Sequence, residues 1–163
     1  MHSTEVQTVT VPRVKAAWYI LCQSKELSKK PLKRKLWGVP LVLFRDENGE
    51  PGALIDQCPH RTVPLSEGQV CRGRLQCPYH GWEFDREGAC THVPGLLDDE
   101  VVKARSALSY PTVEQQGFVW VYGVAGATPE SQPFDFVKAD QPGYLTVRHE
   151  VSAKASIHAI AEN

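Results

Sequence analysis

The chain has 163 residues, of which 42% are hydrophobic and 23% are charged, and its formal net charge is −1. This composition is typical of an ordinary globular domain, and the near-zero charge gives no reason to expect binding to nucleic acid or to a membrane surface. The polar N-terminus lacks the apolar core of a secretory signal, and no apolar run approaches the length of a membrane span. We therefore expect a cytoplasmic protein that is not embedded in a membrane.

An all-β fold is predicted from the distribution of apolar residues. Short segments rich in β-branched and aromatic residues, bounded by turn formers, are the expected strands. Twelve prolines and twelve glycines punctuate the chain, which opposes long helices and favours a small sandwich or barrel of short antiparallel strands. In chain order, the expected strands cover residues 16–22, 39–45, 52–56, 74–76, 82–84, 118–122 and 144–151, with a hairpin loop at 46–50.

A basic segment, residues 25–35, follows the first expected strand and carries six lysine or arginine side chains around Pro31. One interpretation is a docking patch for an acidic partner. The other is a solvated loop between two strands, and it is favoured because runs of charge usually lie on the surface.

The five cysteines, at positions 22, 58, 71, 77 and 90, are an odd number and a poor basis for a disulfide framework. Without a secretory signal we expect a reducing compartment, where clustered Cys and His residues are more often metal ligands than disulfide partners. Cys22 lies in an apolar run and is expected to be a buried thiol. Cys71 and Cys90 have no partner at ligand spacing and are assigned no role.

The strongest chemical signal is a pair of motifs, Cys58-Pro59-His60-Arg61 and Cys77-Pro78-Tyr79-His80-Gly81-Trp82, with sixteen residues between His60 and Cys77. Each motif supplies one sulfur and one imidazole, whereas structural zinc sites usually combine a Cys pair with a His pair. Interleaved donors suit a cluster with two inequivalent irons. We assign Cys58 and Cys77 to one iron and His60 and His80 to the other. Zinc at the same four residues, and donors that do not meet in space, are the alternatives.

The donor set also predicts the electronic character of such a cluster. Two ferric ions, two sulfides and four thiolates sum to about −2, whereas two thiolates and two neutral imidazoles bring the sum to about 0. The less negative cluster accepts an electron more readily. Two-iron centres with two histidine ligands accordingly have potentials of roughly −150 to +300 mV, against roughly −400 mV for plant-type ferredoxins. We therefore expect single-electron transfer.

Residues beside the two motifs suit a cluster housing. Gly68 and Gly81 allow close backbone approach, and tight loops can direct N–H groups at the sulfurs. The segment 92–95 is expected to cover the cluster from a third side. Trp82 is expected to be a packing aromatic rather than an electron relay.

The stretch from Trp37 to Pro94, which contains both motifs, resembles the Rieske non-haem iron oxygenases. It is similar to the subgroup that contains pheophorbide a oxygenase, chlorophyllide a oxygenase and vanillate O-demethylase. Rieske proteins of the cytochrome bc type have an extra Cys in each ligand loop, and neither motif has one here.

The resemblance implies a Rieske domain at residues 1–124, followed at 125–163 by a connector and the start of a catalytic domain. In that family the catalytic domain holds a mononuclear Fe(II) that activates O₂, electrons come from a reductase or a ferredoxin, and the subunits form a homotrimer. The last residues, Ala161-Glu162-Asn163, are similar to the Glu-Asn that precedes the iron ligands. Those ligands are then expected beyond Asn163.

Two functions are compatible with this sequence. The first is the terminal oxygenase component of a system that oxygenates a small organic substrate. The second is a stand-alone Rieske-type ferredoxin, which carries electrons and has no substrate of its own. The first is favoured because residues 140–163 are surplus for a ferredoxin.

Overall fold

The computed structural model describes residues 14–96, 103–138, 141–149, 151, 154–155 and 160. Short strands, turns and three 3₁₀ helices make up this part of the chain. The elements are β1 (Trp18–Gln23), η1 (Ser24–Glu26), β2 (Leu32–Leu36), β3 (Val39–Arg45), β4 (Pro51–Ile55), η2 (Leu65–Glu67), β5 (Gln69–Cys71), β6 (Arg74–Gln76), β7 (Glu83–Phe84), β8 (Cys90–His92), η3 (Lys103–Arg105), β9 (Ser109–Tyr110), β10 (Thr112–Gln115) and β11 (Phe118–Tyr122).

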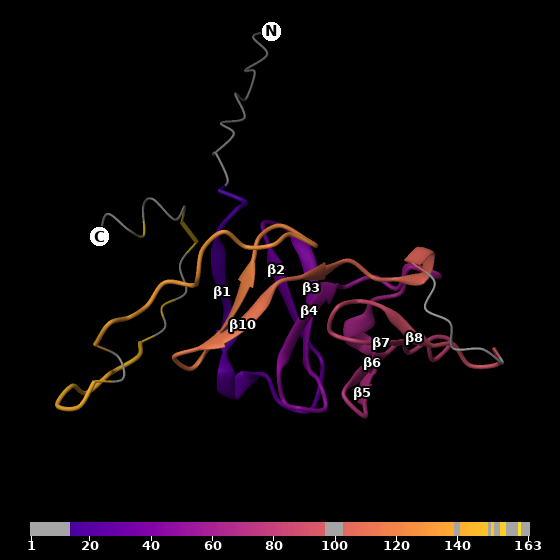
Figure 1. Cartoon of the computed structure of the whole chain (residues 1–163), viewed down its shortest axis with the longest axis horizontal. Helices are drawn as coiled ribbons and strands as arrows, with labels where there is room; N and C mark the ends of the chain where they lie inside the picture. Colours follow the sequence, from indigo (N-terminus) through magenta and orange to yellow (C-terminus); the bar gives the residue numbers. More distant parts are fainter. Residues whose placement is uncertain are drawn as a thin grey trace, which may run out of the picture.

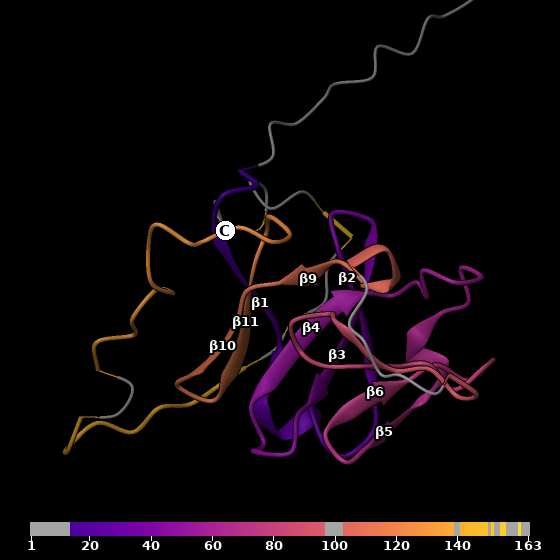
Figure 2. The same ribbon diagram turned by 45° about the vertical axis from the view of Figure 1, so that its right-hand side comes forward.

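The strands form three antiparallel sheets, here called A, B and C. Sheet A has the order β1-β11-β10, sheet B the order β2-β3-β4-β9, and sheet C the order β5-β6-β7-β8. Figures 1 and 2 show sheet B between sheets A and C. The expected all-β fold is confirmed: sheets A and B pack as a sandwich, and sheet C forms a smaller subdomain beside them.

The central strand β3 is buried on both faces because its alternate side chains enter two different cores. Leu41 and Leu43 pack in a core with Val119 of sheet A. Val42 and Phe44 point the other way, into a core shared with sheet C. This explains the continuous apolar run of β3, since a strand covered on both faces has no polar side.

Part of the basic segment is a strand, which corrects the expectation of a loop. Leu32–Leu36 forms β2, the edge of sheet B, paired with β3. Lysines on an edge strand disfavour pairing with another chain. Two of the basic residues have acidic partners within the chain, Lys33 with Asp56 and Arg34 with Glu26.

The guanidinium of Arg45 ties sheet A to sheet B. Arg45, at the end of β3, donates to both carboxylate oxygens of Glu114 on β10, with N–O distances of 2.6 and 3.0 Å. The same guanidinium donates to the carbonyl oxygens of Leu27 at 2.8 Å and Gly49 at 2.7 Å. These contacts fix the two sheets near the hairpin loop 46–50.

The expected strands between residues 16 and 122 match β1, β3, β4, β6, β7 and β11. The strand expected at 144–151 is wrong, because its described residues, 144–149 and 151, belong to no strand. Strands β2, β5, β8, β9 and β10 were not expected. They are short and rich in polar residues, so neither alternation nor apolar content marks them.

No helix in the described ranges is long and apolar enough to cross a membrane. Among the described residues, the last strand is β11, which ends at Tyr122. The division of the chain after residue 124 stays a prediction. The Glu-Asn pair at positions 162 and 163 lies outside the described residues.

Candidate metal centre

Two loops at one end of the sheet B–sheet C core carry the four expected ligands. The first loop, residues 57–64, connects β4 to η2. The second loop, residues 77–82, connects β6 to β7. The two loops therefore leave different sheets and meet over one shared core.

The backbone of the first loop is closed by two hydrogen bonds. The N–H of Thr62 donates to the carbonyl of Cys58 at 2.8 Å, and the N–H of Cys58 donates to the carbonyl of Val63 at 2.9 Å. Thr62 takes a positive φ of 56° within this turn. The cysteine is thus held at both its N–H and its carbonyl.

The second loop repeats the same pattern at the same spacing. The N–H of Gly81 donates to the carbonyl of Cys77 at 3.2 Å, and the N–H of Cys77 donates to the carbonyl of Trp82 at 2.8 Å. Gly81 has a φ of 71°, which an L-residue adopts only with strain. Two matching turns therefore present the two cysteines.

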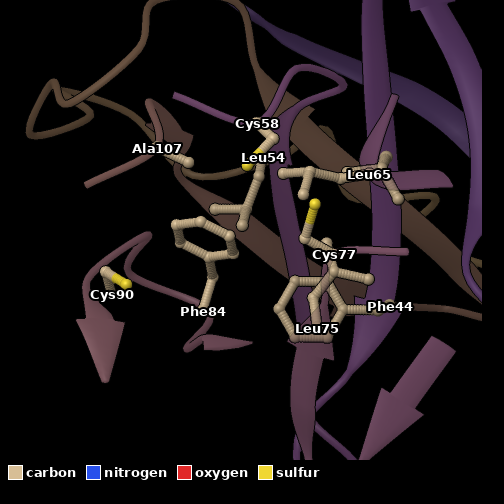
Figure 3. Close-up of a cluster of buried hydrophobic side chains, with 10 residues drawn as sticks. Phe44, Leu54, Cys58, Leu65, Leu75, Cys77, Phe84, Cys90 and Ala107 are labelled. Atoms are coloured by element: carbon tan, nitrogen blue, oxygen red, sulfur yellow. The ribbon is translucent and has the colours of Figure 1, made fainter. Parts of the chain in front are cut away.

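The two cysteine side chains lie together at the edge of the apolar core. Cys58 is 1% exposed and Cys77 is 4% exposed, and both belong to the core that also contains Phe84. Figure 3 shows them near Leu65, while Cys90 lies apart from them beyond Phe84. Both side chains therefore belong to one buried cluster beneath the two loops.

The first loop also directs backbone donors at a sulfur. The pKa of the Cys58 thiol is raised to about 11, mainly by burial and also by the neighbouring Cys77, while backbone hydrogen bonds from His60 and Arg61 oppose the increase. N–H groups that point at a sulfur stabilise the thiolate form that binds metal. This geometry fits a cysteine that serves as a metal ligand.

The two imidazoles pair on the outer side of the sulfurs. Nδ1 of His60 and Nδ1 of His80 lie 3.1 Å apart, and the ring centroids are 4.8 Å apart. Both histidines are exposed, in contrast to the buried cysteines. Two nitrogens that face one another on neighbouring loops can serve one metal ion.

The four donors are therefore sorted by element: sulfur lies beside sulfur on the inside, and imidazole lies beside imidazole on the outside. Within the described ranges, no three His, Cys, Asp or Glu side chains gather closely enough to hold a single metal ion. Sorting by element is the arrangement required by a two-iron cluster with one iron bound by thiolates and one by imidazoles.

A buried carboxylate supports the first loop. Asp56, two residues before Cys58, accepts hydrogen bonds from the N–H of Ser66 at 2.7 Å and from its hydroxyl at 2.8 Å. The ammonium of Lys33 lies 3.3 Å from the same carboxylate, whose side chain is only 1% exposed. The start of the loop is thereby tied to η2, which follows its end, and to the edge strand β2.

A second buried carboxylate supports the second loop. Glu83, directly after Trp82, accepts a hydrogen bond from the side-chain amide of Gln76 at 3.1 Å, and Arg74 lies 3.7 Å away. These residues flank the loop on β6 and β7. Neither carboxylate was singled out from the sequence. Their only sequence signal is an acidic residue beside an apolar strand and close to a Cys-His motif.

Aromatic rings flank the histidines. The indole of Trp82 stacks on the imidazole of His60, with a centroid distance of 4.7 Å and an interplanar angle of 1°. The ring of Tyr79 lies 3.9 Å from that of His80 at an angle of 39°. Trp82 also packs against the core, as expected. Its contact with His60 was not expected.

The segment expected to cover the site lies against the second loop. A Cβ placed on Gly81 would come 3.1 Å from Cγ of Pro94. A Cβ on Gly68 would overlap the carbonyl oxygen of Gln76, so this glycine allows η2 to approach β6 closely. Both glycines therefore permit the close backbone approach that the sequence predicted.

The remaining cysteines lie away from the two loops. Cys22 is buried in the core between sheets A and B, as expected, and burial raises the pKa of its thiol to about 11. Cys71 lies on β5, where its thiol is 3.8 Å from the side-chain oxygen of Gln76. Cys90 lies on β8, with its thiol 3.7 Å from the carbonyl of His92.

Comparison with known proteins identifies the family. The Rieske [2Fe-2S] domain model matches residues 17–105. Dicamba O-demethylase, oxygenase component, from Stenotrophomonas maltophilia is 42% identical over 136 residues, which are 82% of this chain and 40% of that protein. Chlorophyllide a oxygenase from Chlamydomonas reinhardtii is 40% identical over 129 residues, which are 78% of this chain and 19% of that protein.

A solved structure shows the same relationship. The crystal structure of dicamba monooxygenase with non-heme iron and dicamba matches with a TM-score of 0.72 and 40% identity, over 80% of this chain and 40% of that one. The chain thus spans less than half the length of these relatives. The expected resemblance to Rieske non-haem iron oxygenases is confirmed. Because the family match includes both loops and more than half of the chain, this protein belongs to the Rieske [2Fe–2S] domain family.

Proposed function

We propose that the two loops hold a Rieske-type [2Fe–2S] cluster, with Cys58 and Cys77 on one iron and His60 and His80 on the other. The observation that carries this proposal is the pairing of donors by element, sulfur with sulfur and imidazole with imidazole. The bound cluster supplies reversible one-electron transfer. The backbone N–H groups that point at Cys58 favour its thiolate form, which zinc and iron both require.

The burial pattern assigns different roles to the two sides of the site. The buried cysteines would keep water from the iron that they bind. The exposed imidazoles of His60 and His80 would hold the other iron at the surface. A histidine that binds metal through one ring nitrogen can donate a hydrogen bond from the other. Electron exchange with a partner is therefore expected at the histidine face.

For the whole protein, we propose the role of a terminal oxygenase component. In this role, electrons from a reductase or a ferredoxin pass through the Rieske domain to a mononuclear iron that activates O₂ toward a small organic substrate. The names of the relatives, dicamba O-demethylase and chlorophyllide a oxygenase, support this role. A homotrimer and a cytoplasmic location remain part of the proposal.

The cluster is tested by analysis of the purified protein. We expect equal amounts of iron and acid-labile sulfide and a rhombic EPR signal after reduction. Cys58→Ser and Cys77→Ser should each abolish the signal, whereas Cys71→Ser, on the edge strand β5, should preserve it. A colourless protein that contains zinc would refute the proposal.

The charge argument has its own test. His60→Cys exchanges a neutral ligand for an anionic one, so an intact cluster should have a lower reduction potential. The potential is measured by redox titration of the EPR signal. An unchanged potential in an intact cluster would show that ligand charge does not set it.

The oxygenase role is tested by the gene. We expect the reading frame to continue past Asn163 and to encode an Asp and two His residues that bind the mononuclear iron. The full-length protein should then consume O₂ in the presence of reductant and substrate. A reading frame that ends at Asn163 would leave the stand-alone ferredoxin as the function.

A further inference from the structure

Trp82 belongs to the second loop, yet its ring lies against a histidine of the first. The indole and the imidazole of His60 are parallel within 1°, with centroids 4.7 Å apart. At this distance parallel rings are offset-stacked, a favourable arrangement for aromatic pairs. The stack is a direct contact of the second loop with the face of the His60 ring, in addition to the contact of His80 with the ring nitrogen.

The indole is itself held in place from two directions. The carbonyl of Trp82 accepts the N–H of Cys77 at 2.8 Å, and the side chain packs against the core under both loops. The next two residues, Glu83–Phe84, are buried in β7. His60, in contrast, is exposed, and the terminal torsion of a histidine side chain has a broad energy minimum. The anchored indole of Trp82 can therefore orient the exposed imidazole of His60.

The other histidine has a different neighbour. His80 contacts Tyr79, the residue before it in the same loop, at an angle of 39°. Tyr79 is 60% exposed. Its phenol ring is therefore not anchored in the core as the indole of Trp82 is. The two imidazoles have unequal support, even though the two loops share one backbone pattern.

We propose that Trp82 is a positioning residue for the cluster: it fixes the ring plane of His60 relative to the outer iron and covers one face of that imidazole from water. This inference rests on the proposed function, because it requires His60 to be an iron ligand. An offset-stacked pair is favourable beyond the area that it buries, so the stack favours one orientation of the His60 ring.

The test compares three variants of the cluster-containing protein. Trp82→Ala removes both the aromatic ring that stacks on His60 and the shielding of His60 from water. Trp82→Leu keeps an apolar side chain but no aromatic ring, and Trp82→Phe keeps a smaller aromatic ring. Fixed orientation is read from the ¹⁴N hyperfine couplings of the reduced cluster. In the wild type and Trp82→Phe, we expect one sharp ¹⁴N coupling for each of the two histidines. In Trp82→Ala and Trp82→Leu, the coupling of one histidine should be broadened.

The reduction potential tests separately whether Trp82 shields His60 from water. Water beside an imidazole stabilises the additional negative charge of the reduced cluster, so Trp82→Ala should raise the potential. Trp82→Leu excludes water and should leave the potential closer to that of the wild type. Loss of iron to a chelator should be severalfold faster in Trp82→Ala. Trp18→Leu, which removes an indole from sheet A, is the matched control and should change none of these readouts.

The outcomes separate this inference from the proposed function. A wild-type protein without a rhombic signal would refute the cluster itself. An intact cluster in Trp82→Leu with wild-type nitrogen couplings would overturn the positioning role. If Trp82→Ala and Trp82→Leu bind no cluster while Trp82→Phe and Trp18→Leu do, the requirement for a ring plane is supported. Failure of Trp82→Phe to bind a cluster would show that the indole is needed for folding and would also overturn the positioning role.

Discussion

The first and second loops of the candidate metal centre share their backbone hydrogen bonds but differ in what holds them. In the first loop, the carboxylate of Asp56 accepts two short hydrogen bonds from Ser66 and faces the ammonium of Lys33. In the second loop, the carboxylate of Glu83 has one longer hydrogen bond and a guanidinium at 3.7 Å.

The second loop is held more by packing. Gly81 lies against Pro94, and Trp82 is packed between the core and His60. The same turn can therefore be fixed by buried charge or by close van der Waals contact. The first loop should be sensitive to the loss of charge, and the second to a change in shape. Hydrogen exchange in peptides covering residues 57–68 and 77–84 reports the opening free energy of each loop.

Asp56→Asn is expected to have the largest effect on the opening free energy of either loop. The amide replaces an accepting oxygen with a donor and removes the partner of Lys33. Hydrogen bonds to a buried charged group contribute about 1.5–3 kcal/mol, so opening of the first loop should be easier by about 2 kcal/mol. Exchange in residues 57–68 should then be about 30-fold faster. An equal increase in residues 77–84 would show that the loops are not held independently.

Gly81→Ala tests the second loop through its shape. A φ of 71° is strained for alanine, and the new methyl group would press on Pro94. We expect a loss of about 1–2 kcal/mol, seen as faster exchange in residues 77–84. Gly38→Ala is the control, because Gly38 has a φ of 86° but no atom within 4 Å of the added Cβ. If residues 57–68 respond as strongly to Gly81→Ala, packing supports both loops.

Glu83→Gln is the counterpart of Asp56→Asn, with a smaller expected effect. The glutamine can still accept from Gln76, and the ion pair that it loses involves the half-exposed Arg74. Such a pair is weakened by solvent, so we expect a loss of about 1 kcal/mol or less. The measurement is exchange in residues 77–84. An effect as large as that of Asp56→Asn would remove the distinction between the loops.

The smallest effect is expected from the Arg45–Glu114 ion pair, which lies away from both loops and serves as the baseline. A hydrogen bond from Arg45 lowers the pKa of Glu114 below its usual value of 4.5. The stability that this pair adds is present above pH 4.5 and is lost as the pH falls through the lower, folded-state pKa. Glu114→Gln should cost about 0.5 kcal/mol at pH 7.

The urea midpoints of wild type and Glu114→Gln should converge as the pH falls below 4.5 and through the folded-state pKa of Glu114. A difference between the two midpoints that grows as the pH falls would contradict the direction of the pKa shift. At pH 7, exchange in both loops should remain at the wild-type rate, because Arg45 and Glu114 join sheet A to sheet B.

Much of the candidate site could be read from the sequence because its donors are close in sequence. Two short motifs place a cysteine and a histidine in each turn, and their spacing predicts all four candidate donors before any fold is known. The apolar run of β3 was equally clear, because both of its faces are buried. In contrast, the strand expected at 144–151 had suitable residue types but forms no strand in its described residues.

The sequence by itself determined the kind of donors, their grouping into two turns and the all-β class, since each depends on residues only a few positions apart. The tertiary structure alone decided which buried carboxylate supports which loop and that Trp82 lies on His60. Asp56 and Ser66 are ten residues apart, and Trp82 and His60 are twenty-two residues apart. Such contacts exist only because two separate sheets converge on one apolar core, and no local pattern in the chain encodes that convergence.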